Sequence, residues 1–417
     1  MTGGTRKRGE TWSYYFDMGT VNGKRKKKEK GGFKTKKEAA AALAVAISEY
    51  NNAGLVFEPS SISVSDYLDL WYKDYCLMNM KHNSLLGVER VIRVHLKPRF
   101  GNYKLKALST APIQEFVNDL KKNGYSLRFT KNIFSVLKTA LDYAVYTLHY
   151  IKDNPCIGVK IPKYPDQKPV DRYVIPPEDF DRIIERFPEG SPYYLPLMIG
   201  YYTGLRISEV FALTWDDIDL KERTITVNKQ TVKMKSYGEK KAKASVWYFQ
   251  SPKTEASNRT VYFGDTLYRV LRNARVQKYN NRIGQGTAFI EYYKKPDKDE
   301  KGDPIWQLVP VPRLVRMPLE SADLVCVRST GEYVSSDSFK YCARVIHYEL
   351  MMNFNFHSLR HTHATYLVES GANIKDVQER LGHQNVETTI NTYVHDTEQL
   401  RKQTVDIFES AIASKRA

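Results

Sequence analysis

The sequence is poor in cysteine. Its 417 residues include four cysteines, which stand far apart and form no CxxC pair: Cys76, Cys156, Cys326 and Cys342. This spacing predicts reduced thiols, and it argues against a disulfide framework or a zinc knuckle.

Long apolar runs are also absent. None reaches the roughly 18 residues that a bilayer-spanning helix needs. The first ten residues, MTGGTRKRGE, lead into a polar and aromatic stretch instead of the apolar core of a signal peptide. We therefore expect no membrane contact and a cytoplasmic location.

Acidic residues are in deficit. Lys and Arg number 64 against 47 Asp and Glu, which gives a formal net charge of +17. Such an excess suits a polyanionic partner, because neutralised phosphates release condensed counterions. A merely soluble basic protein would also show it, so charge alone leaves both interpretations open. Hydrophobic residues make up 42% of the chain, and its length allows two or three folded domains.

Residues 1–55 have the pattern of a small domain with a sheet and one helix. Alternate residues from Trp12 to Met18 are apolar, which is the period of a strand, and an Asn-Gly turn signal follows. Thr35 to Glu38 fits a capping box, and an Ala-rich helix is expected from there to about Tyr50.

A strongly basic run lies inside this first segment. It can be a solvated hairpin face, but beside an ordered strand we favour contact with DNA. The residues assigned to that contact are Lys24, Arg25, Lys26, Lys27 and Lys28.

Residues 62–165 are predicted to be helical throughout and to form a four-helix bundle. The fourth helix is the clearest, because an apolar stripe at i, i+3, i+4 spacing runs from Ile133 to Leu148. We expect Pro98 and Gly101 to stop the second helix and Asn154-Pro155 to end the fourth. The expected helices cover residues 66–75, after possible caps at Ser63 and Ser65, 84–96, 112–122 and the stripe.

A Pro-rich, basic linker near residues 160–169 precedes a mixed domain over 170–417. Helices are expected near 177–187, 193–202 and 208–213, and strands near 224–227, 246–250 and 259–263. The charged stretch 291–304 is predicted to be a solvated loop or hairpin.

Four segments of this domain carry residues suited to phosphate chemistry. They are Thr203-Gly204-Leu205-Arg206-Ile207-Ser208-Glu209; Ser251-Pro252-Lys253-Thr254 followed by Ser257-Asn258-Arg259-Thr260-Val261; His357-Ser358-Leu359-Arg360-His361-Thr362; and Leu381-Gly382-His383 followed by Thr388-Thr389-Ile390-Asn391-Thr392-Tyr393-Val394-His395. A single Arg is more often a surface ion-pair residue, and a single Tyr more often packs in a core. Their joint occurrence in order is what indicates a site.

Through these segments the sequence resembles the tyrosine recombinases, which include phage integrases and the integrases of conjugative transposons. All six active-site positions of that family are matched, in chain order, by Arg206, Lys253, His357, Arg360, His383 and Tyr393. The resemblance implies a multidomain fold: an arm-site DNA-binding domain of a small β-sheet plus a helix, an all-α core-binding domain of the SAM-like kind, and a mixed α+β, mostly helical catalytic domain. It covers nearly the whole chain, with specific motifs in the catalytic domain and weak ones in the first.

The residue types fit that chemistry. Displacement at a phosphodiester builds negative charge on the non-bridging oxygens, and the guanidinium groups of Arg206 and Arg360 can stabilise it as charged forks. Tyr393 is the expected nucleophile; a phenol with a pKa near 10 needs a base, for which His357 is suited. His383 would donate a hydrogen bond to the phosphate.

Other roles follow from the resemblance. Lys253, at the tip of a hairpin between two strands, resembles the family's general acid for the leaving 5′-oxygen. Glu209 either orients a catalytic side chain or is a surface carboxylate. We expect no cofactor and no metal, because the histidines His357, His361 and His363 lack a carboxylate or thiolate at ligand spacing. His361 and His363 are expected to be structural or to face solvent.

The implied function is site-specific integration and excision of a mobile element through a 3′-phosphotyrosine intermediate. Its expected partners are double-stranded DNA at attachment and arm sites, a homotetramer on DNA, and a small accessory excision factor. An amphipathic stripe over residues 400–417 either packs on its own domain or docks on a neighbouring protomer. A type IB topoisomerase and a regulator without catalysis are the alternatives. The basic first domain argues against the topoisomerase, and the complete set of six residues argues against the regulator.

Overall fold

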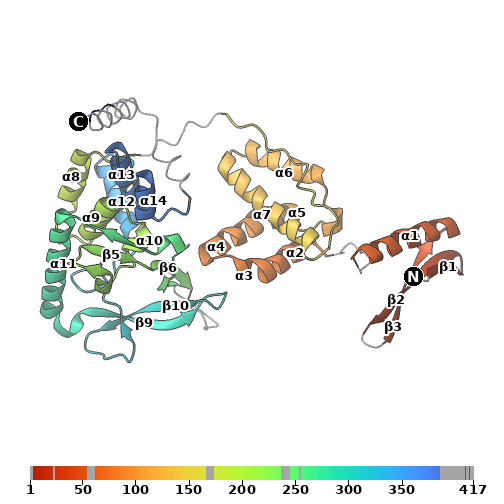
Figure 1. The fold of residues 1–417 in the computed structure, drawn as a ribbon, viewed down its shortest axis with the longest axis horizontal. Coiled ribbons are helices and arrows are strands. Elements are labelled where there is room, and N and C mark those ends of the chain that lie inside the picture. Colours follow the sequence, from red (N-terminus) through yellow and green to blue (C-terminus); the bar gives the residue numbers. More distant parts are fainter. Residues whose placement is uncertain are drawn as a thin grey trace. The chain divides into compact units, whose positions relative to one another are not determined.

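A computed structural model describes residues 3–21, 24–53, 62–165, 173–235, 245–252 and 255–385, together with residues 409 and 413. The chain divides into two compact units, Met1–Asp166 and Gln167–Ala417. Figure 1 shows a sheet with a helix and then a helical bundle in the first unit, and a larger mixed structure in the second. Among the described residues, no helix has the length and apolarity needed to cross a membrane.

The N-terminal part of the first unit is a three-stranded antiparallel sheet covered by one helix. Its elements are β1 (Gly3–Arg8), β2 (Thr11–Val21), β3 (Lys24–Phe33) and α1 (Lys36–Ala53), with strand order β1-β2-β3. Tyr14 and Phe16 of β2 are buried against Ala46 of α1, as the alternating pattern predicts. The Thr35 hydroxyl accepts a hydrogen bond from the Glu38 amide at 3.1 Å and so caps the helix.

The basic run forms the edge strand β3 of this sheet. Lys27 is exposed and Lys28 is half-buried, whereas the side chains of residues 24–26 lie outside the described part of the chain. An edge strand with an exposed cationic side chain is accessible to a polyanion on one side.

The rest of the first unit is the expected helical bundle. Its elements are α2 (Val64–Trp71), η1 (Tyr72–Cys76), α3 (Leu77–Asn79), α4 (His82–Val91), η2 (Ile92–Leu96), α5 (Lys97–Phe100), η3 (Leu105–Ala107), α6 (Thr110–Lys122) and α7 (Leu127–Tyr146). Fully buried Trp71 and Leu137 belong to its core, and the Asp66 amide donates to the Ser63 hydroxyl at 3.0 Å to cap α2. Ser63, and not Ser65, is therefore the cap.

Two expected helix ends are wrong. Pro98 does not stop the second helix, which continues to Phe100 and ends at Gly101, the other expected stop. The π-helical turn η2 just before it widens the backbone, so the proline ring enters a new first turn without an i−4 bond to break. The fourth helix ends at Tyr146, well before Asn154, because His149 takes a positive φ of 52° and the chain turns back there.

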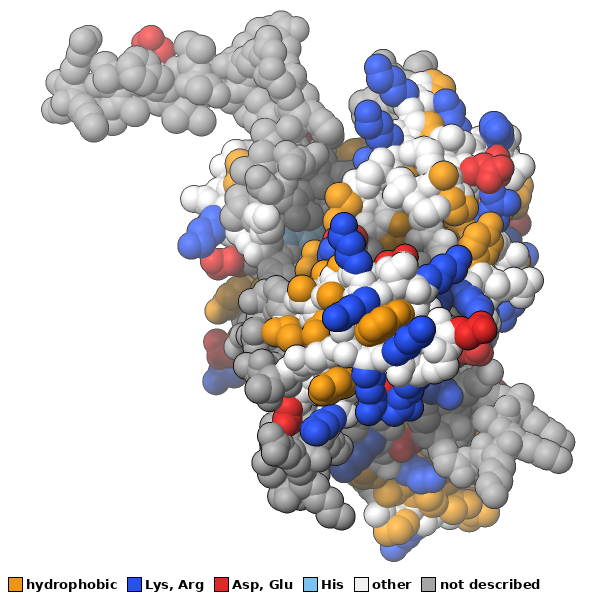
Figure 2. All heavy atoms as spheres, turned by 90° about the vertical axis from the view of Figure 1, so that its right-hand side faces the viewer, with side chains coloured by type: hydrophobic (Ala, Val, Ile, Leu, Met, Phe, Trp, Pro, Cys, Tyr) orange, Lys and Arg blue, Asp and Glu red, His pale blue; other side chains and the backbone are white. Residues whose placement is uncertain are grey.

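Figure 2 shows many Lys and Arg side chains on the described residues of the chain. Among the side chains coloured there, Lys and Arg outnumber Asp and Glu, and hydrophobic side chains lie between them. This distribution matches the formal net charge of +17. Cationic side chains interleaved with apolar ones form the kind of surface that nucleic acid binds.

The second unit combines helices with two small sheets. Its helices are α8 (Pro177–Arg186), α9 (Tyr194–Thr203), α10 (Ile207–Val210), η4 (Trp215–Asp217), η5 (Glu255–Ser257), α11 (Asp265–Gly284), η6 (Gly286–Ala288), α12 (Ser336–Glu349), α13 (Phe356–Glu369) and α14 (Ile374–Leu381). Its strands are β4 (Ile218–Asp219), β5 (Thr224–Val227), β6 (Gln230–Lys235), β7 (Ser245–Gln250), β8 (Arg259–Tyr262), β9 (Ile290–Lys298), β10 (Pro304–Pro312) and β11 (Glu320–Ser321). The sheet orders are β4-β5-β8 and β11-β9-β10-β7-β6.

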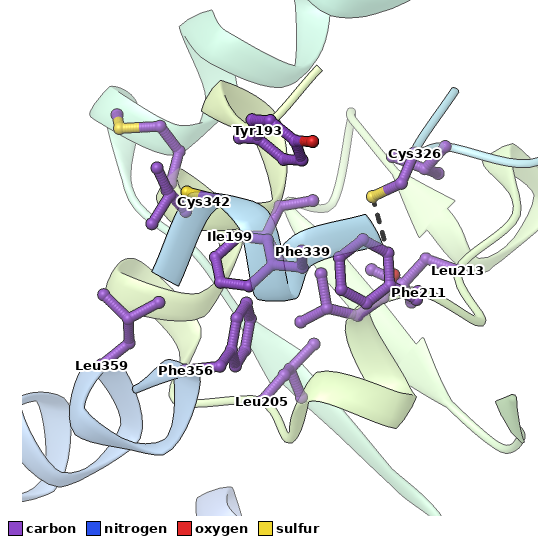
Figure 3. Close-up of a cluster of buried hydrophobic side chains, with 14 of the residues drawn as sticks. Tyr193, Ile199, Leu205, Phe211, Leu213, Cys326, Phe339, Cys342, Phe356 and Leu359 are labelled. Atoms are coloured by element: carbon purple, nitrogen blue, oxygen red, sulfur yellow. Dashed lines mark hydrogen bonds between the residues drawn. The ribbon is translucent and has the colours of Figure 1, made fainter. Parts of the chain in front are cut away.

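A buried aromatic cluster holds the helices of this unit together (Figure 3). The Phe339 ring of α12 meets the Phe356 ring of α13 edge-on, with centroids 5.1 Å apart, and Phe211 lies 6.0 Å from Phe339. Gly200 lets α9 approach α13 closely, because a Cβ atom there would lie 2.8 Å from Leu359 Cδ1. Burial of large rings at one point stabilises the unit and fixes the relative positions of α9 and α13.

Most predicted elements of this unit are confirmed, with two corrections. The third helix, expected over 208–213, is the single turn α10, because Leu213 leaves the helix to accept a 2.9 Å hydrogen bond from the Val325 amide. The strands β7 and β8 on either side of Lys253 do not pair with each other; they belong to different sheets, so the expected hairpin is wrong. The stretch 291–304 is a hairpin, one of the two structures expected for it.

Candidate functional site

Arg360 lies at the centre of the candidate site. It is in the second turn of α13, which begins because the Asn355 side chain accepts a hydrogen bond from the Ser358 amide at 3.2 Å. Its side chain is fully buried. Its Nη1 donates to the Gly204 carbonyl at 2.9 Å and its Nη2 to the Leu381 carbonyl at 2.7 Å. The guanidinium therefore joins the C-terminal ends of α9 and α14, which are the ends that attract a cation.

Arg206 reaches the same place from another helix. It is the N-cap residue of α10 and follows Gly204, whose φ of +68° turns the chain out of α9. Its Nη2 donates to the Gly382 carbonyl at 2.9 Å, next to the carbonyl that Arg360 uses. About a third of the Arg206 side chain is exposed (33%), so it borders the surface of the site.

Glu209 is the counter-ion of the site. Only 3% of it is exposed, so the alternative of a surface carboxylate is wrong. Its Oε1 accepts from Arg206 Nη1 at 2.8 Å, and its Oε2 from Arg259 Nη2 at 2.9 Å. Burial acts to raise the pKa of Glu209, but the charges of Arg259 and Arg206 outweigh it and hold that pKa below the usual value. Glu209 therefore stays ionised and orients Arg206.

His383 follows the end of α14 directly. Gly382 ends the helix with a φ of +66°, and the His383 amide donates to the Gln378 carbonyl at 3.1 Å. Burial, followed by the charges of Arg360 and Arg206, lowers the pKa of His383 to about 3. A neutral imidazole carries one N–H donor, which suits a hydrogen bond to a phosphate oxygen.

His357 lies in the first turn of α13 and is exposed, whereas Arg360 in the next turn is buried. Its ring meets that of His361 edge-on, with centroids 4.4 Å apart, and it lies close enough that a positive charge on it lowers the pKa of His383. Within the described ranges, no group of three His, Cys, Asp or Glu side chains is arranged to hold a metal ion.

The sequence did not point to two further cations of the site: Arg259, whose side chain is nearly buried, and half-buried Arg380. Arg259 follows Lys253 by six residues, and the family's six active-site positions do not include it; its Nε donates to the Arg380 carbonyl at 2.6 Å. The side chain of Arg380 donates to His363 Nε2 at 2.9 Å, while His363 Nδ1 lies 3.0 Å from the Tyr201 carbonyl. His363 is therefore structural, as one of the two expectations had it. Arg259 begins strand β8 and Arg380 lies in the last turn of helix α14. A single cation at either place gives no periodic signal, so neither stands out in the sequence.

The structure brings four of the six expected site residues together: Arg206, His357, Arg360 and His383. Lys253, Tyr393 and the stripe after Leu400 lie outside the described residues.

The chain matches three family models, which together span much of its length. Residues 174–399 match the phage integrase family, residues 63–121 the N-terminal SAM-like domain of phage integrases, and residues 5–50 an arm DNA-binding domain. The first match alone covers more than half of the chain.

Similar proteins include a XerC-like tyrosine recombinase of Caldanaerobacter subterraneus, 27% identical over 379 residues (90% of this chain and 89% of the relative). The ICEBs1 integrase of Bacillus subtilis is 24% identical over 345 residues (80% of each chain).

Among solved structures, the Tn1549 transposon integrase in complex with a circular intermediate DNA superposes with a TM-score of 0.61 at 21% identity, over 83% of this chain and 100% of that one. A lambda integrase tetramer bound to a Holliday junction gives a TM-score of 0.53 at 16% identity, over 89% of this chain and 91% of that one. These structures share the fold. With the family matches and the converging arginines, they lead to one conclusion: the chain belongs to the phage integrase family of tyrosine recombinases and is a site-specific DNA recombinase.

Proposed function

We propose that the chain integrates and excises a mobile element by cutting and rejoining DNA through Tyr393. The observation that carries this proposal is the convergence of two guanidinium groups on one turn. Arg360 and Arg206 donate to the consecutive carbonyls of Leu381 and Gly382, and His383 follows immediately. Two cations held beside a neutral donor match the charge that develops on a phosphorus under attack.

The reaction needs four events, in which bonds and protons balance. The Tyr393 phenolic oxygen forms a bond to the phosphorus, and the bond from phosphorus to the 5′-oxygen breaks. His357 accepts the phenolic proton, and Lys253 supplies one to the leaving oxygen. The phosphotyrosine bond keeps the energy of the phosphodiester, so another strand's 5′-hydroxyl reverses the step without ATP. Arg206 and Arg360 supply the charge stabilisation, and no cofactor is invoked.

The proposal also covers the roles of the three domains and the assembly of several protomers on DNA. Domains at 1–55, 62–165 and 170–417 would bind arm sites, bind core sites and perform the chemistry, which the matches to arm-binding and SAM-like models support. The lambda integrase tetramer on a Holliday junction supports four protomers holding two attachment sites. A small accessory excision factor would then select the direction of recombination.

A covalent adduct tests the chemistry. The protein is incubated with nicked DNA from the ends of the element in EDTA and run on a denaturing gel beside Tyr393→Phe. We expect an adduct for the native chain and none for the variant, while both bind DNA. An undiminished adduct with Tyr393→Phe would reassign the nucleophile. Absence of any adduct would favour a regulator, and trapping on unrelated duplexes without recombination would favour a topoisomerase.

A further inference from the structure

Arg259 occupies the floor of the site without reaching its surface. Only 7% of its side chain is exposed. It is the first residue of β8. Its guanidinium lies against the turn that ends α14, where a Cβ atom on Gly382 would be 3.0 Å from Arg259 Nη1. The guanidinium is thus covered by the backbone that carries His383.

Its donors point to three separate parts of the chain. Nη2 and Nη1 reach the two carboxylate oxygens of Glu209 at 2.9 and 3.3 Å. Nε donates to the Arg380 carbonyl at 2.6 Å, and Nη1 also reaches the Ser257 carbonyl at 3.1 Å. One rigid fork therefore ties β8 to α10 and to the last turn of α14.

Both of those partners hold proposed catalytic groups. Glu209 binds the guanidinium of Arg206, and the last turn of α14 supplies the carbonyls that Arg206 and Arg360 bind. A displacement of either partner by a fraction of an ångström would misplace cations aimed at the phosphate, and catalysis is sensitive to such shifts.

We propose that Arg259 is a positioning residue: it fixes Glu209 and the end of α14 relative to each other, and thereby aligns Arg206, Arg360 and His383 on the scissile phosphate. It touches neither the DNA nor the reacting atoms. This inference rests on the proposed function of those three residues. It assigns Arg259 to the phosphate-binding part of the site and not to the protonation of the leaving group by Lys253.

The test compares Arg259→Gln and Arg259→Lys with Arg272→Gln, a control on the exposed surface of α11. DNA binding and the rate of adduct formation are measured for each full-length variant. We expect native affinity but cleavage roughly 10- to 100-fold slower for both Arg259 variants, comparable to the loss when a group that orients a metal ligand is removed. Lysine should not restore the rate, because its three donors share one nitrogen and cannot reproduce the planar fork in which Nε, Nη1 and Nη2 each reach a different acceptor.

A second substrate separates the two parts of the site. When sulfur replaces the bridging 5′-oxygen, the leaving group is a thiolate with a pKa of about 8.5, which departs without a general acid. Lys253→Ala should regain its rate on this DNA. The Arg259 variants should stay slow, since charge on the non-bridging oxygens still needs the aligned arginines.

The outcomes are distinct. Native cleavage by either Arg259 variant, or recovery on the sulfur substrate, overturns the positioning role. Failure of Lys253→Ala to recover, or an adduct with Tyr393→Phe, instead counts against the proposed function. Where Arg259→Gln loses DNA binding through misfolding, Arg259→Lys, which keeps a charge opposite Glu209, provides the same comparison.

Discussion

At the residue scale, Arg206 makes two contacts from two separate terminal nitrogens. A lysine ammonium has a single nitrogen and cannot reproduce this pair. One of its terminal nitrogens binds Glu209 and the other the Gly382 carbonyl. We expect Arg206→Lys to keep the charge and lose this orientation, slowing adduct formation roughly 100-fold or more, as when a preorganised donor is removed from a transition state. Single-turnover cleavage beside Arg272→Lys measures the effect. Near-native cleavage would show that charge alone is sufficient.

The shifted pKa of His363 predicts how the free energy of unfolding depends on pH. Burial and the neighbouring Arg380 charge lower its pKa to about 4, against an unfolded value near 6.5. Below pH 6.5 the unfolded chain therefore binds a proton that the folded chain resists. The stability that this group contributes is fully present above pH 6.5 and is lost as the pH falls towards 4, by roughly 2–3 kcal/mol.

Urea unfolding of the catalytic unit within the full chain measures this effect at pH 7.5 and 5.0. We expect a lower free energy of unfolding at pH 5.0 and a smaller pH-dependent loss in His363→Gln. The glutamine amide does not titrate, yet it has both a donor for the Tyr201 carbonyl and an acceptor for Arg380. An unchanged pH dependence in this variant would mean that other groups cause the loss.

At the scale of secondary-structure elements, we expect the stability of the catalytic unit to depend on the close packing of α9 against α13. A Cβ at Gly200 would meet Leu359 Cδ1 at 2.8 Å and Phe356 Cζ at 2.9 Å, whereas one at Gly284 in α11 would meet nothing within 4 Å. Gly200 lies inside α9 and Gly284 is the last residue of α11. Alanine therefore gains at least as much helix propensity at Gly200, so a loss of stability there comes from packing.

We expect Gly200→Ala to lower the free energy of unfolding by about 1–3 kcal/mol, because overpacking must separate the helices. Gly284→Ala should be neutral or stabilising by up to about 1 kcal/mol. Thermal melting of both variants checks this, together with adduct formation, since α13 carries Arg360. Equal melting temperatures would indicate that α9 and α13 separate without cost.

At the scale of the whole molecule, we expect the net positive charge to determine the affinity for DNA. The excess of Lys and Arg predicts binding that weakens steeply with salt. Lys27 on β3 and Lys37 on α1 are both exposed cations of the first domain. If β3 faces DNA, Lys27→Gln should reduce the slope of log affinity against log salt by about 0.9, the value for one phosphate contact, and Lys37→Gln should not.

Binding to DNA from the ends of the element, titrated at several salt concentrations, provides the measurement. Equal slopes for the two variants would remove β3 from the DNA interface. Cleavage of nicked core-site DNA should be unaffected in both variants, since neither lysine belongs to the catalytic unit.

The sequence by itself determined the domain-scale fold and the order of the site residues. Local periodicity is enough to predict β2, α7 and β5, because each buries one face at a regular spacing. The motifs likewise identified Arg206 and Arg360 by residue type and order. The sequence pattern gave a wrong helix end at Pro98, because a π-helical turn just before it lets the helix continue through the proline.

Only the tertiary structure decided which groups meet. Arg259, Arg380 and His363 come from different elements, and nothing in their local sequence marks them as partners of the site. It also showed that β7 and β8 pair with other strands and that Glu209 is buried between two arginines. Burial and long-range hydrogen bonds depend on how distant segments pack, and this information is not contained in the spacing of residues along one segment.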